Sequence, residues 1–275
     1  MKNLFSVAAL SVCLTLGATT QISAESAPAA TQTKQQSGTV INLAGKQRML
    51  TQKMSKEALF IAKGIDVDAN KASLAKTVAL FDKTLKGLVA GDTSLNLPKT
   101  ENAEILAQLQ IVTDLWTPFK ANIEKADLAA IAKENIPLLK NMNKAVGMYA
   151  EASGSSLDPE MAKTINLAGK QRMLTQKMTK ELLLVANGID ADANSENAKK
   201  TVALFDKTLK DLTAGCKSDD IKAQFGVVAK TLAEYQPIVE KVDTSDEALA
   251  KAEKLNISLL KESNKAVKML EASIK

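Results

Sequence analysis

Two identical segments of this 275-residue chain carry its most chemically informative side chains. Each reads INLAGKQRMLTQKM; one begins at Ile41 and the other at Ile165. On a helix, the arginine of this segment shares a face with the glycine one turn before it and the glutamine one turn after it. A guanidinium presents its N–H donors as a planar fork, which suits a planar oxyanion. The candidate ligand-binding residues are therefore Gly45, Arg48, Gln52, Gly169, Arg172 and Gln176.

Each of these residues also has a purely structural interpretation. A glycine inside a helix costs about 1 kcal/mol relative to alanine, so Gly45 and Gly169 need a compensating reason. That reason is either close packing of another helix or the approach of a ligand to the backbone. An arginine such as Arg48 can be a solvated charge or an ion-pair partner. The identity of the two segments favours a shared role, because segments such as 99–135 and 221–256 have diverged.

The repeated segment separates into two helical stripes. One is suited to a bundle core and contains Leu43, Gln47, Leu50, Met54 and Ile61. The opposite stripe combines small residues with hydrogen-bond donors, and contains Ile41, Ala44, Gly45, Arg48, Gln52, Ser55, Leu59 and Ala62. The second copy repeats it with Ile165, Ala168, Gly169, Arg172, Gln176, Thr179, Leu183 and Ala186. We therefore expect helices 39–63 and 160–187 to pack side by side, in parallel, within one chain.

The duplication extends over nearly the whole chain and predicts its architecture. The block at 77–86 returns at 201–210, and the block at 143–146 returns at 264–267. Abundant Ala, Leu, Lys and Glu favour helix. We predict an all-α fold of two tandem antiparallel four-helix bundles, spanning residues 38–153 and 160–275. The expected helices are 39–63, 70–90, 101–125 and 127–152, then 160–187, 195–214, 219–242 and 246–273, with Pro118, Pro137 and Pro237 expected to kink or interrupt three of them.

The remaining candidate motifs favour structural roles. Asp66, Asp68 and Asn70, with their equivalents Asp190, Asp192 and Asn194, resemble the opening of a calcium loop, but the loop's glycine and final glutamate are missing. Turns and helix caps explain them better, so no metal site is predicted. Trp116, Phe119 and Tyr235 are expected in the core, and Met49, Met54, Met173 and Met178 in the core or an interface.

Composition excludes several functional classes. The chain has 36 Lys and Arg against 31 Asp and Glu, a net charge of +5, with 3% aromatic residues. This balance is too mild for a nucleic-acid footprint, and few aromatic side chains are available for base stacking. Histidine is absent, and no nucleophile or carboxylate pair takes its place. We expect no catalytic residues, no cofactor and no enzymatic activity.

The N-terminal residues read as a secretion signal. Residues 1–24 combine Lys2, an apolar run and small residues before Glu25, and residues 25–37 read as a flexible polar leader. An uncleaved anchor and lipidation at Cys13 remain the alternatives. No later segment is apolar enough to span a bilayer, so a soluble, secreted or periplasmic protein is expected after signal removal. Cys216 would then be the one remaining cysteine, and a surface thiol is its simplest interpretation.

The segment AGKQRMLTQKM is similar to the start of the PilJ/NarX-type sensor domain, which occurs in the type IV pilus chemoreceptor and in nitrate/nitrite sensor kinases. The resemblance covers both copies and is closer to the pilus-receptor branch. In the nitrate sensors, two subunits pair through their first helices and hold one anion between two arginines, beside the motif glycine. The resemblance implies these roles for Arg48 with Gly45 and for Arg172 with Gly169.

The resemblance also implies a function. We expect non-enzymatic binding of a small anion, such as nitrate or nitrite, or of another small polar ligand, in a sensory or chemotactic context. Family members usually continue into a transmembrane helix and a signalling module, so this chain is expected to act with a membrane receptor or a pilus component. The alternative is a structural protein that uses its helix stripes to pack with such a partner.

Overall fold

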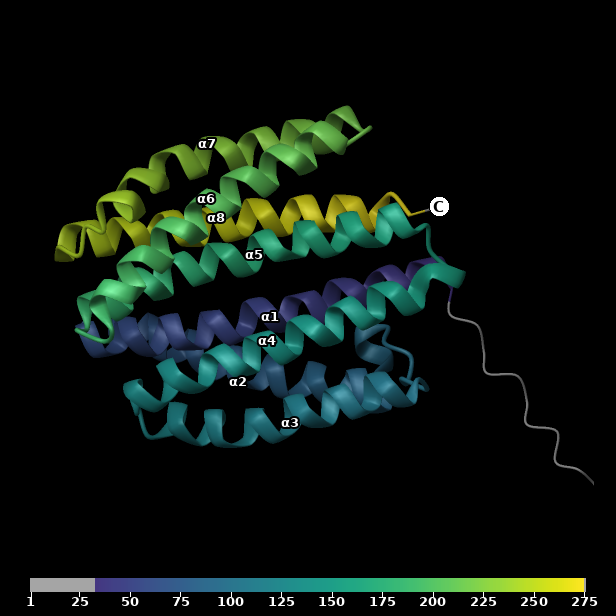
Figure 1. Cartoon of the computed structure of the whole chain (residues 1–275), viewed down its shortest axis with the longest axis horizontal. Coiled ribbons are helices and arrows are strands. Elements are labelled where there is room, and N and C mark those ends of the chain that lie inside the picture. Colours follow the sequence, from purple (N-terminus) through teal and green to yellow (C-terminus); the bar gives the residue numbers. More distant parts are fainter. Residues whose placement is uncertain (1–32, 275) are drawn as a thin grey trace, which may run out of the picture. The chain divides into compact units, whose positions relative to one another are not determined.

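Eight long α-helices make up the part of the chain that the computed structural model describes, residues 33–274 (Figure 1). The first copy consists of α1 (Lys34–Lys63), α2 (Val67–Ala90), α3 (Ala103–Glu124) and α4 (Leu128–Ala152). The second consists of α5 (Pro159–Ala186), α6 (Ala191–Gly215), α7 (Asp219–Lys241) and α8 (Asp246–Ala272), and two short 3₁₀ turns, Thr93–Leu95 and Ser153–Ser155, lie in the connections. The predicted all-α fold of two tandem antiparallel four-helix bundles is confirmed.

The first helix begins before its predicted start at residue 39, because it has a strong N-terminal cap. Thr33 accepts a hydrogen bond from the Gln36 backbone N–H, and the Gln36 side chain accepts one from the Thr33 backbone N–H. Ser37 is buried, and its hydroxyl lies 2.6 Å from that of Ser156. The flexible leader therefore does not include residues 34–37. The expected signal peptide, Cys13 and the rest of the leader lie outside the described residues.

Three helices continue through a proline, so of the two predicted outcomes, a kink or an interruption, the interruption is excluded. Pro118, Pro137 and Pro237 lie inside α3, α4 and α7. A proline removes the bond to the carbonyl four residues earlier. Those carbonyls belong to Asp114, Lys133 and Ala233, which are all exposed residues. Water can therefore replace the lost hydrogen bonds, and packing on the opposite face holds each helix together.

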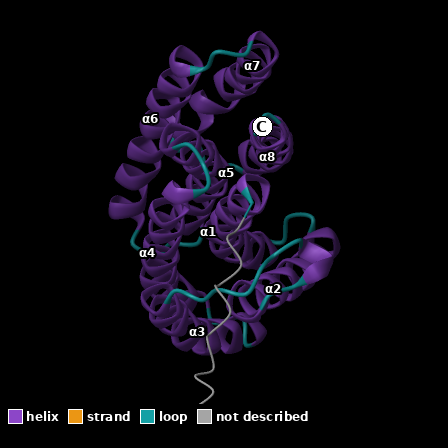
Figure 2. Cartoon of the chain, turned by 90° about the vertical axis from the view of Figure 1, so that its right-hand side faces the viewer, coloured by secondary structure: helices purple, strands orange, loops and turns teal. Residues whose placement is uncertain are grey.

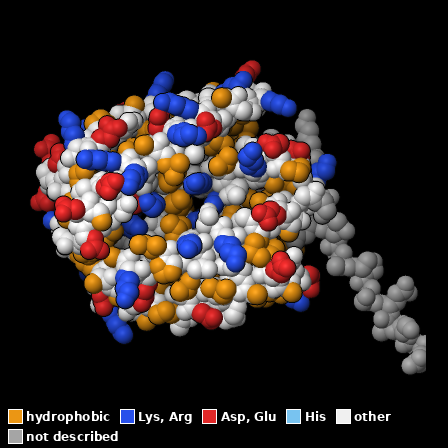
Figure 3. Space-filling view, viewed as in Figure 1, with side chains coloured by type: hydrophobic (Ala, Val, Ile, Leu, Met, Phe, Trp, Pro, Cys, Tyr) orange, Lys and Arg blue, Asp and Glu red, His pale blue; other side chains and the backbone are white. Residues whose placement is uncertain are grey.

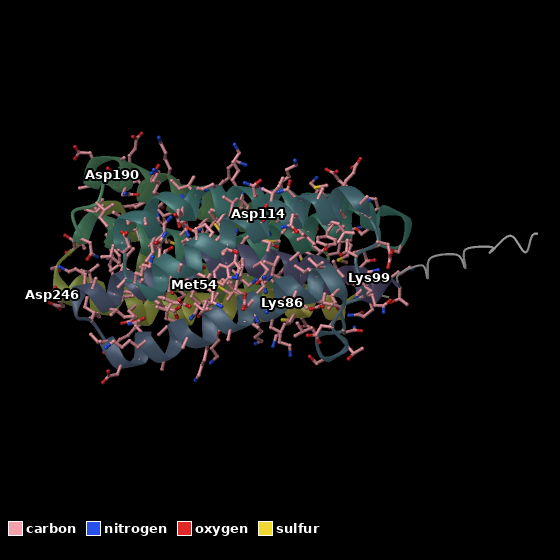
Figure 4. All side chains as sticks on the ribbon, turned by 90° about the horizontal axis from the view of Figure 1, so that it is seen from below. Met54, Lys86, Lys99, Asp114, Asp190 and Asp246 are labelled. Carbon is pink, nitrogen blue, oxygen red and sulfur yellow. The ribbon has the colours of Figure 1, made fainter. Side chains whose placement is uncertain are left out.

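Aromatic residues and methionines fill the core, as predicted. The ring centroids of Phe81 and Trp116 lie 4.3 Å apart, and the indole N–H of Trp116 donates to Asp82 Oδ1 at 2.7 Å. Met54, labelled in Figure 4, is fully buried among the helices. The other predicted core or interface residues, Phe119, Tyr235, Met49, Met173 and Met178, are also buried. Within the described residues, no helix has the length and apolarity to cross a membrane.

The contact between the two bundles is made mainly by the first helix of each. α1 and α5 form the most extensive helix pair of the chain and lie at the centre when the helices are viewed end-on (Figure 2). Their N-terminal halves meet near Gly38 and Ile165, and the Asn187 amide that follows α5 reaches Leu59 O near the end of α1. The two helices therefore run parallel. Their small-residue stripes are buried against each other, with Ala44 at 0% and Ala168 at 2% exposure, which confirms the predicted internal pairing.

Candidate functional site

The structure brings the two motif arginines together at the α1–α5 contact. Arg48 and Arg172 are buried, at 2% and 1% exposure, and each guanidinium crosses to the other copy. Arg48 Nη2 donates to the Asn166 carbonyl at 3.0 Å, and Arg172 Nη2 donates to the Asn42 carbonyl at 3.1 Å. Since Asn42 and Asn166 are equivalent residues, the pair has approximate two-fold symmetry. One chain thus builds an arrangement with the symmetry of a two-fold dimer.

A second pair of asparagines holds the same guanidiniums from within each bundle. Arg48 Nη1 donates to Asn143 Oδ1 at 2.8 Å, and Arg172 Nη1 donates to Asn264 Oδ1 at 3.1 Å. These asparagines begin the repeated block at 143–146 and 264–267, which the sequence analysis had noted without assigning it a role. Each arginine is therefore fixed from two sides.

The two motif glycines leave the space into which the guanidiniums extend. A Cβ atom added to Gly169 would lie 3.4 Å from both Arg48 Nη2 and Arg172 Nη2. One added to Gly45 would lie 3.3 Å from Arg48 Nη2 and 3.8 Å from Arg172 Nη2. The ends of both arginines therefore converge beside bare helix backbone, where a small ligand could contact both.

Positive side chains lie around the pair, and Glu271 near Arg172 is an opposing charge. No carboxylate within the described residues forms an ion pair with either guanidinium, and the Nε atom of each has no partner there. Burial lowers the pKa of Arg48 to about 9, with the charge of Arg172 adding to the effect. Burial lowers the pKa of Arg172 to about 10, and Glu271 opposes that shift. Lys46 lies near Arg172, and Lys170 near Arg48, and in each case burial and then the arginine's charge lower the lysine pKa.

Gln52 and Gln176 lie one helical turn beyond the arginines and contact a different group of residues. Gln52 Nε2 donates to Asn135 Oδ1 at 2.8 Å, and that oxygen also accepts a bond from Lys180 Nζ of the other copy at 3.0 Å. Asn135 Nδ2 in turn donates to the Thr51 carbonyl at 2.9 Å. The arrangement is repeated by Gln176 and Asn256 of the second bundle, with Lys56 of the first bundle as the lysine from the other copy. In both glutamines, Oε1 is buried without a partner in the described structure.

Two further signals in the sequence point to these sites. Arg48 and Arg172 are the only arginines in the chain, although it has 36 basic residues. A chain that uses lysine everywhere else has a guanidinium only at this pair, which indicates a need for the planar fork. Lys56 and Lys180 follow the repeated segment at the same offset, each before a glutamate, and both are buried.

The buried lysines predict that stability rises with pH. Burial lowers the pKa of both Lys56 and Lys180 to about 8, against the opposing charges of Glu57 and Glu181. Between this value and the lysine pKa of about 10.4 in the unfolded chain, the unfolded state binds more protons. The free energy of unfolding should therefore increase over that range, by up to about 1.4 kcal/mol per pH unit for each lysine. Chemical denaturation at several pH values between about 7.5 and 9.5, around the lower part of this range, measures the change in the free energy of unfolding.

Substitution of each buried lysine, with an exposed lysine as control, tests whether Lys56 and Lys180 cause this pH dependence. Lys56→Met and Lys180→Met should each flatten the rise, whereas Lys140→Met, at an exposed position of α4, should leave it intact. A double Lys56→Met, Lys180→Met variant with the slope of the wild type would contradict the assignment.

The remaining sequence candidates have local roles. Asp66 and Asp190 occupy N-cap positions with positive φ, but their side chains do not cap the helices. The amides of Asn70 and Asn194 instead donate to the carbonyls of the preceding turn. Cys216 is half-buried in the loop after α6. Within the described residues, no cluster of three or more His, Cys, Asp or Glu side chains could hold a metal ion.

Comparison with known proteins matches both copies to one family. The family model "PilJ: Type IV pili methyl-accepting chemotaxis transducer N-term" matches residues 29–142 and 159–265. The chain is also similar to "Methyl-accepting chemotaxis protein McpN" of Pseudomonas aeruginosa, with 30% identity over 128 residues. That match covers 44% of this chain and 24% of the relative, so the chain spans only about a quarter of the length of that receptor. The resemblance predicted from the repeated segment, in two tandem copies, is confirmed.

Proposed function

Because the chain belongs to the PilJ family of type IV pili methyl-accepting chemotaxis transducer N-terminal domains, we propose that it is a sensory binding protein for a small oxyanion. The ligand lies between Arg48 and Arg172, beside Gly45 and Gly169. A single observation carries this proposal: both guanidiniums converge beside Gly45 and Gly169, and no carboxylate of residues 33–274 forms an ion pair with either. The protein is non-catalytic in this proposal.

Electrostatics explains why an anion fits this position. Two like charges that are buried close together repel each other more strongly than in water, since the interior screens them less. An anion between Arg48 and Arg172 replaces this repulsion with two attractions. It can also accept hydrogen bonds from donors that have no partner, such as the Nε–H of each arginine. A planar oxyanion of the nitrate or nitrite type matches the planar forks. Gln52 and Gln176 then support the site from one turn away.

The biological role follows the family. A periplasmic or secreted chain that binds an anion can present it to a membrane chemotaxis receptor or to a pilus component. The internal pairing of α1 with α5 means that one chain suffices to complete the anion site. The alternative, a structural protein that packs its small-residue stripes on a partner, is weakened because those stripes are already buried inside the chain.

Ligand-dependent thermal stability tests the proposal. Nitrate, nitrite, sulfate and chloride are added separately to the purified protein, and unfolding is followed by calorimetry. A hundredfold excess over the dissociation constant should stabilise the protein by about 2.7 kcal/mol. We expect a planar oxyanion to give the largest shift and chloride the smallest. Equal shifts with all four salts would reflect ionic strength alone and would refute an oxyanion site.

A further inference from the structure

The duplication creates two related clefts between the bundles, and they differ in charge at one equivalent position. The Glu253 cleft, of about 360 Å³, is lined by Lys56, Asn70, Glu253, Asn256 and Ile257. The Ala132 cleft, of about 900 Å³, is lined by the equivalent residues Lys180, Asn194, Ala132, Asn135 and Ile136. Lys180 and Asn194 follow Lys56 and Asn70 at the spacing that separates Ile165 from Ile41. The residues of α8 follow those of α4 at the spacing that separates Asn264 from Asn143. The main chemical difference is therefore a glutamate in one cleft and an alanine in the other.

In the Glu253 cleft, the chain's own carboxylate occupies the polar end. Asn70 Nδ2 donates to Glu253 Oε1 at 2.8 Å, in addition to its two bonds to backbone carbonyls. The ammonium of Lys56 lies close enough to attract the carboxylate, and Glu253 is only 6% exposed. Lys56 itself donates to Asn256 Oδ1 at 3.0 Å. This cleft therefore holds one carboxyl group against Asn70 and Lys56, although burial and the nearby Asp66 raise the pKa of that group.

The Ala132 cleft is also lined by two carboxylates, but Glu181, which pairs with Lys177, and Asp190 are the equivalents of Glu57 and Asp66 and not of Glu253. Asn194 Nδ2 keeps its bonds to the Ile189 and Asp190 carbonyls, and no side chain takes the place of Glu253. Lys180 Nζ donates to Asn135 Oδ1 at 3.0 Å, its one hydrogen bond within the described residues. An ammonium has three donors, so Lys180 keeps donors available. A buried cation with unused donors is costly unless a ligand satisfies it.

The walls of the Ala132 cleft add an apolar surface. Ile136 is 66% exposed, and Leu139 and Leu184 also line the cleft. The volume is within the range of small-molecule sites, about 300–1,000 Å³. Figure 3 shows the face that carries α4 and α5, which is hollowed between the bundles and has Lys or Arg side chains around the hollow. Asp190, which also lines the cleft, lies at the end of the molecule that carries Asp246, opposite Lys99 (Figure 4).

We propose that the Ala132 cleft binds a small organic carboxylate, whose carboxylate group takes the place that Glu253 occupies in the other cleft. The carboxylate accepts hydrogen bonds from Asn194 and Lys180, and its short apolar chain packs on Ile136. This site is separate from the arginine pair, because Lys180 follows Arg172 by eight residues, roughly 12 Å along α5. It does not depend on the proposed oxyanion function.

Calorimetric titration with butyrate tests the proposal, and the uncharged butyramide is its control. The wild-type protein should bind one butyrate per chain and no butyramide. Ala132→Glu should abolish butyrate binding, because the new carboxylate occupies the cleft as Glu253 does. Ala132→Gln, which adds similar volume without charge, should also block the cleft. Both variants should still respond to nitrate as the wild type does, which separates this site from the arginine pair.

Removing the glutamate from the Glu253 cleft tests the same proposal through a gain of butyrate binding. Glu253→Ala should empty the Glu253 cleft and create a second butyrate site, raising the stoichiometry from one per chain to two. Glu253→Gln keeps the cleft occupied and should leave the stoichiometry at one. Parallel titrations with L-2-aminobutyrate show whether the ligand is a simple carboxylate or an amino acid, whose ammonium would lie beside Asp190. Undiminished butyrate binding by Ala132→Glu, or no carboxylate binding by either wild type or Glu253→Ala, would overturn the proposal.

Discussion

Replacing both Arg48 and Arg172 by alanine should abolish oxyanion binding while the protein remains folded. Each arginine is expected to supply charge-assisted hydrogen bonds, worth about 1.5–3 kcal/mol each, so the loss of one should weaken binding roughly ten- to hundredfold. The fold should persist, because the α1–α5 contact is made largely by small and apolar side chains. The unliganded protein should become less stable, since the change leaves a cavity and removes the donors to Asn143, Asn264 and the carbonyls of Asn42 and Asn166, while the loss of like-charge repulsion offsets only part of this cost. Isothermal calorimetry and circular dichroism measure the two effects.

Two substitutions, Arg48→Lys and Lys46→Ala, provide the controls for this experiment. Arg48→Lys keeps a positive charge but lacks the planar fork, so it should restore binding only in part. Lys46→Ala removes a nearby charge that contributes to the field but makes no bond to the arginines, so it should weaken binding much less. If the double alanine variant bound nitrate as well as the wild type, the assignment of the site to the arginine pair would be wrong.

Replacing Gly169 by alanine should move stability and binding in opposite directions. The added methyl group would lie 3.4 Å from both Nη2 atoms, which is an ordinary contact but occupies the space between the guanidiniums. Alanine stabilises a helix interior by up to about 1 kcal/mol relative to glycine, so the unliganded protein should become more stable. Oxyanion affinity should fall about tenfold or more, as expected for the loss of a charge-assisted hydrogen bond. Thermal unfolding with and without nitrate measures both.

Gly147→Ala is the matched control for this substitution. Gly147 is also inside a helix, α4, and an added Cβ there would meet nothing within 4 Å. It should raise stability to a similar degree and leave nitrate affinity unchanged. A Gly169→Ala variant that bound nitrate normally would show that the glycine serves helix packing alone.

The sequence predicted the helices and their pairing because both depend on local patterns. The repeat gave the two-bundle architecture, and the stripe of Ala44, Gly45 and Arg48 indicated that α1 meets its own copy α5. The start of α1 was missed because the polar residues before Gly38 were read as a leader, whereas Thr33 and Gln36 form a capping box. That the prolines do not interrupt their helices could not be predicted, because the exposure of the carbonyls that lose their bonds depends on tertiary packing.

The environment of the site could be predicted only in part. The arginines and glycines were identified from the repeated segment. Their hydrogen bonds to Asn166 and Asn42 join residues 118 and 130 positions apart, so they depend on the relative position of α1 and α5. The connection of Gln52 to Lys180 through Asn135 likewise joins three helices. The difference between Ala132 and Glu253 has meaning only when both are placed in their clefts.

The stoichiometry of oxyanion binding tests the central claim most directly, which is that one chain builds a complete two-arginine site. Nitrate is titrated into the protein by calorimetry, and sedimentation under the same conditions measures the size of the binding species. We predict one nitrate per chain, bound by the monomer with an affinity independent of protein concentration. One nitrate per two chains, or binding only by a dimer, would show that the site forms between molecules and would contradict the internal pairing of Arg48 with Arg172 as the binding site.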